Sequence, residues 1–318
     1  MKIISTGSAA PELAVTNEMF SRVLDTSDEW IFTRTGIRSR RISTGDTALS
    51  MAARAAENAI AAAGIDRAEI GLVVCASVTN EYLTPSLACL LQRDLGLPES
   101  ILAFDVNAAC SGFIYALGIA QQLIPAGKYA LLLGSEHLSR VTDYSDRSTC
   151  VLFGDGSGAV IAEKSDAPFH FVSGARGDSG VLYIGASPPS PNPFAPPPES
   201  SPSKLLHMDG QGVFRFAVEV MVKSVREVAS RAGKALGEIT HFVCHQANSR
   251  IIENAATRLG VPLERFFMNI ETRGNTSAAS VPIALDELNA TGGLRRGDSV
   301  ILAGFGGGLT YGAIYLEW

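Results

Sequence analysis

Cys110 is the residue of this sequence best placed to act as a nucleophile. Within residues 105–112 it follows an apolar run, residues 101–104, and it precedes a stretch rich in alanine and glycine that predicts a helix. The free amides and the macrodipole at a helix N-terminus stabilise an anion, and they can lower the pKa of a thiol from about 8.5 toward neutrality. An isolated cysteine is more often a buried core residue, so the residues that accompany Cys110 decide its interpretation.

Three other residues suggest what such a thiol would do. A thiolate is a good acyl acceptor, so we expect Cys110 to attack a thioester and carry the acyl group. The backbone amides of Cys110 and of Gly307, in a run of three glycines, are expected to hold the oxyanion of the tetrahedral intermediate. His245 and Asn275, taken singly, would be read as a core histidine and a turn residue. Together they suggest a pair of neutral donors for an enolate oxygen, which suits carbanion formation by loss of CO2 better than hydrolysis.

The composition limits the classes of protein to consider. A chain of 318 residues with 46% hydrophobic residues buries a large core, in one large domain or two. A formal charge of −6 argues against nonspecific binding to nucleic acid. Five cysteines without a CxxC pair favour neither a disulfide framework nor a zinc site, so no metal is expected. The first residues lack an apolar signal region, so we expect neither secretion nor membrane spanning, and a reducing cytoplasm fits best.

An internal repeat indicates the architecture. Residues 63–75 and 232–244 share an Ala-Gly pair, four intervening residues, a Glu-Ile pair and a Val-Cys pair. Three more pairs of segments follow in the same order: 95–98 with 259–262, 127–134 with 297–304, and 153–156 with 305–308. Four matches in register over about 170 residues predict a duplicated unit of helix followed by buried strand.

The duplication predicts a layered α/β fold. Continuous apolar strands that alternate with helices indicate a mostly parallel sheet covered on both faces, and two such halves give an α/β/α/β/α body. We divide the chain into residues 1–168, which carry the nucleophilic cysteine, and residues 169–318, which carry His245, Asn275 and the glycine turn. The two halves are expected to form one compact unit.

Residues 187–203 interrupt this regularity, because they hold eight of the fifteen prolines. Such a segment forms neither a helix nor an interior strand. A surface loop with polyproline II character is one interpretation, and a mobile cover over the entrance to the active site is the other.

Several motifs together resemble the β-ketoacyl-acyl carrier protein synthase III family of thiolase-like condensing enzymes, over nearly the whole chain. The matching segments are residues 25–31, 33–38, 108–113, 153–156, 245–248, 274–280 and 305–308. The resemblance implies a thiolase-like homodimer in which Cys110 is the nucleophile and His245 and Asn275 serve decarboxylation and condensation. It also implies a coenzyme A thioester as substrate, a malonyl-acyl carrier protein as the second substrate and no permanently bound cofactor.

The resemblance also assigns binding residues. Trp30 and Arg147 are expected to sandwich the adenine of coenzyme A, which is physically reasonable because indole and guanidinium faces stack on a purine. The other expected coenzyme A contacts are Thr26, Arg34, Gly210, Phe214, Ala247 and Asn248. The residues expected to dock an acidic acyl carrier protein are Arg215, Arg250 and Arg258.

One position departs from the family pattern. Many relatives place a bulky aromatic residue immediately before the proline that corresponds to Pro85, across the dimer from the acyl pocket, whereas this chain has Thr84. A smaller side chain would lengthen the acyl channel, so acetyl is not a safe assumption for the primer.

Three alternatives use the same residues differently. A specialised relative would make another ketide, ester or amide from an acyl thioester. A Cys-His-Asn hydrolase would use the same residue types, but the setting of Asn275 and the internal repeat do not suit one. A catalytically silent scaffold subunit should have lost one of the three residues, and none is lost.

Overall fold

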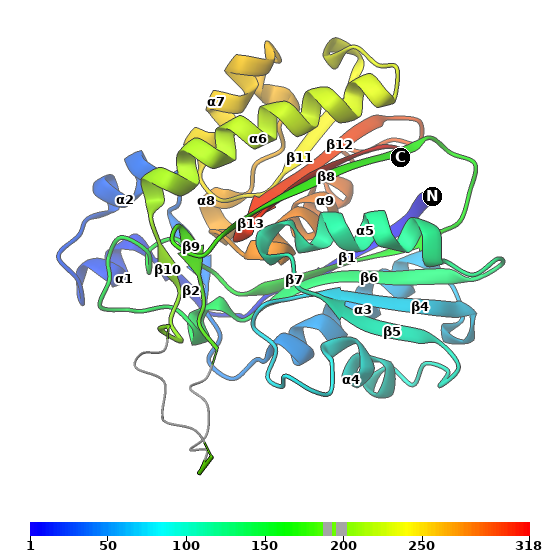
Figure 1. Cartoon of the computed structure of the whole chain (residues 1–318), viewed down its shortest axis with the longest axis horizontal. Coiled ribbons are helices and arrows are strands. Elements are labelled where there is room, and N and C mark those ends of the chain that lie inside the picture. Colours follow the sequence, from blue (N-terminus) through cyan, green and yellow to red (C-terminus); the bar gives the residue numbers. More distant parts are fainter. Residues whose placement is uncertain (187–192, 195–201) are drawn as a thin grey trace.

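The structure is a computed structural model, and it describes residues 1–186, 193–194 and 202–318. Two β-sheets lie one above the other, with a layer of helices between them and a further layer on each outer face (Figure 1). The expected α/β/α/β/α body built from two similar halves is therefore confirmed. Most of the proline-rich segment, about which we formed two expectations, lies outside the described residues.

Each half of the chain builds one of the two large sheets. The first has the order β1 (Lys2–Ala9), β7 (Gly156–Glu163), β6 (Tyr129–Glu136), β4 (Ile70–Ala76) and β5 (Leu102–Val106). The second has the order β11 (His241–Cys244), β12 (Ser299–Gly306), β13 (Gly308–Glu317) and β8 (Phe169–Asp178). The boundary that we place near residue 168 falls between β7 and β8 and stays a prediction.

The sheets are mixed, so the expectation of a mostly parallel sheet is wrong. The pairs β4–β5, β4–β6 and β11–β12 are parallel, whereas β1–β7, β6–β7, β12–β13 and β13–β8 are antiparallel. The physical reason is clearest at β12 and β13, which are joined through Gly307 alone. A turn this short reverses the chain and leaves the second strand antiparallel to the first.

Two central helices fill the space between the sheets. They are α5 (Gly112–Leu123) and α9 (Ser280–Ala290). Both are apolar on most of their surface, as a helix between two sheets must be, and they share one core cluster with residues of both sheets. The first residue of each helix follows a single 3₁₀ turn, which is η2 (Ala109–Ser111) before α5 and η6 (Ser277–Ala279) before α9.

The outer layers are amphipathic helices whose apolar faces cover one sheet each. The helices α3 (Ala48–Ala63) and α4 (Leu87–Asp94) cover the first sheet, and α6 (Gly210–Arg231) and α7 (Ser249–Leu259) cover the second. The matched Ala-Gly pairs mark the ends of α3 and α6, where Gly64 and Gly233 adopt left-handed φ angles of 65° and 67°. The strand β5 has a counterpart in the second half that is reduced to one parallel bridge between Phe242 and Phe266.

Shorter elements gather at one end of the layers, beside the site described below (Figure 1). They are β2 (Ala14–Thr16), α1 (Asn17–Ser21), α2 (Asp28–Thr35), β3 (Ser39–Arg41), η3 (Leu138–Arg140), β9 (Leu182–Tyr183), β10 (His207–Met208) and α8 (Ile270–Arg273). The remaining 3₁₀ turns are η1 (Arg67–Glu69), η4 (Leu236–Glu238) and η5 (Leu263–Arg265). Among the residues that the structure describes, no helix is both long and apolar enough to cross a membrane.

Candidate functional site

One cavity of about 960 Å³ brings the predicted chemical groups together. Cys110 comes from the first half of the chain, and His245, Asn275 and Gly307 come from the second. The predicted coenzyme A contacts that also line the cavity are Trp30, Arg34, Gly210, Phe214, Ala247 and Asn248. Gly185 and Ala186, which precede the proline-rich segment, also line the cavity, and the Gly185 amide donates to the Ser203 carbonyl at 2.7 Å.

The backbone around Cys110 is held in an uncommon conformation. Cys110 lies in η2, between the end of β5 and the start of α5, as the sequence predicts. The preceding residue, Ala109, has a φ of 45°, in the left-handed region that residues other than glycine rarely adopt. Such strain persists only where the surroundings over-determine the backbone, and it is frequent at functional sites.

The glycine turn between β12 and β13 lies directly against Cys110. A Cβ atom on Gly306 would stand 2.6 Å from the Cys110 backbone nitrogen, so only glycine allows this approach. The Thr310 hydroxyl lies 3.0 Å from the Ala108 carbonyl oxygen and 2.9 Å from that of Gly307, and it accepts from the Ser111 hydroxyl at 2.8 Å. Thr310 therefore ties the two turns together, and no motif in the sequence identified it.

The pKa of Cys110 differs from the sequence expectation. The pKa of the thiol is raised to about 12. Burial is the largest cause and the Glu136 carboxyl acts in the same direction, whereas a hydrogen bond with Ser277 acts against them. The expected lowering by the helix N-terminus is wrong, because desolvation of the thiolate outweighs the amides at the start of α5. The resting group is therefore a neutral thiol that must lose its proton when it attacks.

His245 is a neutral imidazole. It directly follows β11 and is 1% exposed, and this burial lowers its pKa to about 3. Its ring meets the Phe305 ring edge-on at 5.1 Å between centroids, and its Nδ1 lies 2.6 Å from the Ser280 hydroxyl oxygen. The side chain is thus fixed on two sides. Ser280 is a further residue that the sequence did not identify.

Asn275 is held by its backbone and by one side of its amide group. Its N–H donates to the Leu152 carbonyl at 2.8 Å, and its carbonyl accepts from the Gly154 amide at 2.9 Å. Its Oδ1 accepts from the Ser277 amide at 2.9 Å, and Ser277 has a left-handed φ of 48°. Because Oδ1 is occupied, the side-chain NH2 group remains to donate in the cavity that Asn275 lines.

Glu136 is a buried acid near this centre that sequence reasoning missed. It ends β6, is fully buried, and accepts hydrogen bonds at Oε2 from the Thr79 hydroxyl at 2.6 Å and the Val78 amide at 3.2 Å. Burial raises its pKa to about 7. In the sequence, Glu136 stands at the end of an apolar strand. Only the tertiary structure brings its carboxyl close enough to Cys110 to raise the pKa of the thiol.

Two guanidinium groups lie on the Trp30 indole, which lines the cavity. The Arg34 and Arg147 guanidinium carbons are 4.6 Å and 5.1 Å from the ring centroid. A purine stacked between the indole and Arg147 needs about 7 Å between those two faces, so Arg147 must move outward to admit one. Arg147 also donates to the Asp25 carbonyl. The two residues expected to sandwich adenine are therefore in contact with each other, and the adenine clamp stays a prediction. Arg147 and Thr26 do not themselves line the cavity.

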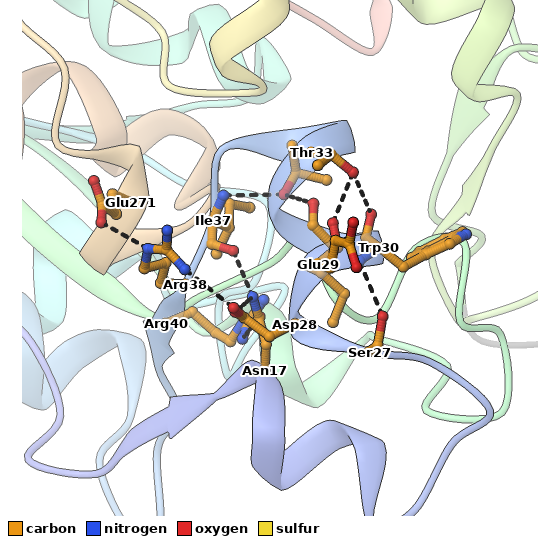
Figure 2. Close-up of polar contacts among 12 residues, drawn as sticks. Asn17, Ser27, Asp28, Glu29, Trp30, Thr33, Ile37, Arg38, Arg40 and Glu271 are labelled. Carbon is orange, nitrogen blue, oxygen red and sulfur yellow. Dashed lines mark hydrogen bonds and ion pairs between the residues drawn. The ribbon is translucent and has the colours of Figure 1, made fainter.

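A polar network holds the helix α2 that carries Trp30 (Figure 2). The Ser27 hydroxyl accepts from the Trp30 amide at 3.1 Å and caps the helix. Arg38 joins the first residue of α2, Asp28, to Glu271 on α8, with distances of 3.0 Å and 3.1 Å. Since α8 ends two residues before Asn275, these contacts connect the helix that carries Trp30 with the turn that carries Asn275.

The three predicted docking arginines lie on the outer helices that cover the second sheet. Arg215 lies on α6, Arg250 and Arg258 lie on α7, and all three are exposed. Arg226 on α6 donates to the Arg258 carbonyl at 2.7 Å and so links α6 to the end of α7, although the sequence did not single it out.

Thr84 does not line the cavity of its own chain. It is exposed, and its neighbour Leu83 lines the cavity instead. A contribution of Thr84 to an acyl pocket therefore depends on a second copy of the chain.

Comparison with known proteins places this arrangement among condensing enzymes. Residues 104–178 match the family profile described as 3-oxoacyl-[acyl-carrier-protein (ACP)] synthase III, and residues 229–318 match the profile of its C-terminal part. The chain is 46% identical to the beta-ketoacyl-[acyl-carrier-protein] synthase III of Acholeplasma laidlawii, with 100% of the chain and 98% of the relative covered.

Solved structures give the same result. A 3-oxoacyl-[acyl-carrier-protein] synthase III from Aquifex aeolicus superposes with a TM-score of 0.91 at 41% identity, covering 100% of this chain and 99% of the other. The priming β-ketosynthase of the R1128 polyketide pathway superposes with a TM-score of 0.90 at 38% identity, covering 99% and 95%.

Proposed function

Because the chain belongs to the β-ketoacyl-acyl carrier protein synthase III family, we propose that it transfers an acyl group from acyl-coenzyme A to Cys110 and condenses it with malonyl-acyl carrier protein, which initiates fatty acid synthesis. The observation that carries this proposal is the convergence of Cys110, His245 and Asn275 in one cavity. The residues come from two halves of the chain that share a fold, and each occupies the end of a strand or the turn before a central helix.

In the first half-reaction, the Cys110 sulfur attacks the thioester carbonyl, and coenzyme A leaves as the thiol. The oxygen of the tetrahedral intermediate accepts hydrogen bonds from the backbone amides of Cys110 and Gly307. The contact between Gly306 and the Cys110 backbone supports this assignment, because it brings the glycine turn against the nucleophile.

In the second half-reaction, the malonyl group loses CO2 and the resulting carbanion attacks the acyl-Cys110 thioester. The Asn275 NH2 group and His245 hold the enolate oxygen as it forms. Two neutral donors in one cavity favour stabilisation of the enolate charge and activate no water, which separates condensation from hydrolysis.

The substrates reach Cys110 from the side of α2. Trp30 and Arg147 are the proposed adenine clamp, and Arg215, Arg250 and Arg258 are the proposed docking patch for an acidic carrier protein. The chain as a whole is acidic, with a formal charge of −6, so a local group of exposed arginines is a selective surface for an acidic partner. The proposed reaction needs no permanently bound cofactor.

A homodimer is part of the proposal. The strand β5 is an edge strand of the first sheet, and its first residue, Leu102, is 50% exposed. Leu83 is fully exposed and Tyr82 is 56% exposed on the nearby segment that precedes α4. An unpaired edge and adjacent exposed apolar side chains fit pairing with a second copy, which would also bring Thr84 to the partner's acyl pocket.

The reaction is tested by analysing products formed with and without a malonyl thioester. We expect a 3-oxoacyl thioester when acyl-coenzyme A and malonyl-acyl carrier protein are both present, and little free acid with acyl-coenzyme A alone. Rapid release of free acid in the absence of malonyl thioester would instead indicate a thioester hydrolase.

A further inference from the structure

The contact between His245 and Ser280 determines which imidazole nitrogen carries the proton. Both side chains are buried, with 1% and 2% exposed, and Nδ1 lies 2.6 Å from the Ser280 Oγ. Either group could donate in an isolated pair, since a neutral imidazole carries one N–H and a hydroxyl carries one O–H. The other partners of the hydroxyl decide the direction.

Ser280 has already committed its single hydrogen. Its Oγ lies 2.9 Å from the Ser277 carbonyl oxygen, which has no hydrogen to give, so the Ser280 hydroxyl is the donor there. The Gln246 amide points at the same Oγ from 3.4 Å and occupies part of its accepting capacity. The arrangement that satisfies every buried group has Nδ1–H of His245 donating to Ser280, which leaves Nε2 unprotonated.

The duplicated half supplies an internal comparison. The positions of His245 and Ser280 correspond to Ala76 and Gly112 in the first half, since β11 corresponds to β4 and α9 to α5. These two positions also touch in the first half, because a Cβ atom on Gly112 would lie 2.9 Å from the Ala76 Cβ. The second half therefore carries both the imidazole of His245 and the hydroxyl of Ser280. The first half has alanine and glycine at the two corresponding positions.

We propose that Ser280 is a positioning residue that fixes the Nδ1–H tautomer of His245, so that the Nε2 lone pair accepts the proton of Cys110 during acylation. This inference rests on the proposed function and deepens it. It also changes the role expected from the sequence, in which His245 was a neutral N–H donor. Burial keeps the imidazole uncharged in the resting enzyme, which agrees with this role.

The proton balance is complete in both half-reactions. In acylation, the S–C bond of acyl-Cys110 forms, the thioester bond of the substrate breaks, and the proton of the Cys110 thiol passes through Nε2 to the sulfur of the departing coenzyme A. Decarboxylative condensation consumes one proton from solvent. That proton enters at Nε2, where it donates to the enolate oxygen, and it ends on the Cys110 thiolate when the product leaves.

The tautomer is measured directly by NMR of the full-length protein labelled with ¹⁵N-histidine. The chain has five histidines, and His245→Gln identifies the pair of signals that belongs to His245. At pH 7 we expect a pyrrole-type signal for Nδ1 and a pyridine-type signal for Nε2. The reverse pattern would overturn the proposal, whether or not any variant folds.

Kinetics of acylation by acyl-coenzyme A test the consequence. Ser280→Ala should show a mixture of tautomers and acylate Cys110 about tenfold more slowly, since part of the general-base contribution is lost. Ser224→Ala is the matched control, because its buried hydroxyl donates to the Met221 carbonyl within α6 and Ser224 is not among the described residues that line the cavity.

The outcomes distinguish a failure of the Ser280 inference from a failure of the proposed function. Equal acylation rates in Ser280→Ala and the parent, with the tautomer unchanged, would contradict the role of Ser280. Absence of any acyl adduct on Cys110 in the parent would contradict the proposed function, while the ¹⁵N spectrum would still decide the tautomer.

Discussion

The two central helices begin with nearly the same turn, and only one of the turns carries a nucleophile. In the first half, the Asn107 Oδ1 accepts from the amide of Ala109, two residues on, at 3.5 Å, and Ala109 has a left-handed φ. In the second half, the Asn275 Oδ1 accepts from the amide of Ser277 at 2.9 Å, and Ser277 has a left-handed φ. A 3₁₀ turn and a helix follow in both cases.

The difference between the turns lies in their side chains. The position after the strained residue is Cys110 in the first half and Ala278 in the second, and Ala278 is buried. Each turn also lies against the end of a strand from the opposite half, which is β12 for η2 and β6 for η6. The same backbone turn therefore serves two purposes in this protein. One copy presents a sulfur atom and the other presents an amide.

The largest effect is expected from removing the group that distinguishes the turns. Cys110→Ala should reduce acyl transfer by at least about a thousandfold without loss of folding, because the thiol is an attacking group rather than a packing necessity. Cys89→Ala, at an exposed cysteine on α4, is the control and should acylate normally. Formation of ketoacyl product by purified Cys110→Ala would contradict the assignment.

The two asparagines test whether similar turns have different chemistry. Asn275→Ala should lower CO2 release from the malonyl thioester by at least about a hundredfold, since an oxyanion donor is lost, while Cys110 still becomes acylated. Asn107→Ala removes the corresponding side chain and should release CO2 at nearly the parent rate. Equal losses in both variants would show that the asparagines act only by shaping their turns.

The strand ends that face the turns also differ, since Glu136 corresponds in the repeat to Gly306. Burial raises the pKa of Glu136 from 4.5 to about 7, so between these values the unfolded chain has released a proton that the folded protein retains. The stability contributed by this group therefore falls as the pH rises from 4.5 to about 7.

Glu136→Gln removes this titration and keeps an acceptor for Thr79. Its free energy of unfolding relative to the parent should rise across the same pH range, by about 3 kcal/mol in total. Denaturant unfolding of both proteins at pH 5 and pH 8 measures the difference. A difference that stays constant between these pH values would mean that Glu136 does not titrate there.

The chain length of the accepted primer tests whether one chain builds the acyl pocket or a partner chain completes it. If Thr84 reaches the partner's cavity, the parent should accept medium or long acyl-coenzyme A primers. Thr84→Phe should suppress these about tenfold and spare acetyl-coenzyme A, because overpacking costs about 1–3 kcal/mol. Tyr82→Phe, on the same exposed segment, is the control. An unchanged chain-length profile in Thr84→Phe would contradict this assignment.

The outer helices of the two halves differ in charge where they correspond. Arg258 near the end of α7 corresponds to Asp94 at the end of α4. Arg250→Glu and Arg258→Glu should raise the KM for malonyl-acyl carrier protein a few-fold and weaken its dependence on salt, with little effect on a small malonyl thioester. Arg93→Glu on α4 is the control. Equal losses with both malonyl substrates would indicate misfolding or another docking surface.

The sequence predicted the parts of the fold that depend on local pattern and on the repeat. The layered fold, the two related halves and the turn that carries Cys110 all follow from apolar runs and matched glycines. The strand directions could not be predicted, because the direction of a strand depends on the connection that joins it to the preceding strand. The glycine turn at Gly307 reverses the chain into β13, and the sequence spacing alone did not give the direction of that strand.

The sequence predicted those site residues whose types and motifs are typical of a known chemistry. Cys110, His245 and Asn275 stand in motifs whose chemistry is recognisable. Thr310 and Glu136 stand outside the motifs, and Ser280 ends one of them without a role assigned from the sequence. These three act through contacts with residues far from them in the sequence. The pKa of Cys110 was misjudged for the same reason. A helix N-terminus is visible in a sequence, but burial by the opposite half of the molecule is not.

We expect Cys110 to carry the acyl group from the first half-reaction to the second, and a single-turnover experiment follows the acyl group through both. The protein is acylated with acyl-coenzyme A, freed of excess reagent and mixed with malonyl-acyl carrier protein, while peptide mass spectrometry follows the adduct and released CO2 is counted. We expect the adduct on the Cys110 peptide to disappear as CO2 and 3-oxoacyl carrier protein appear in equal amounts. An adduct on another residue, or CO2 release without discharge of Cys110, would contradict the account.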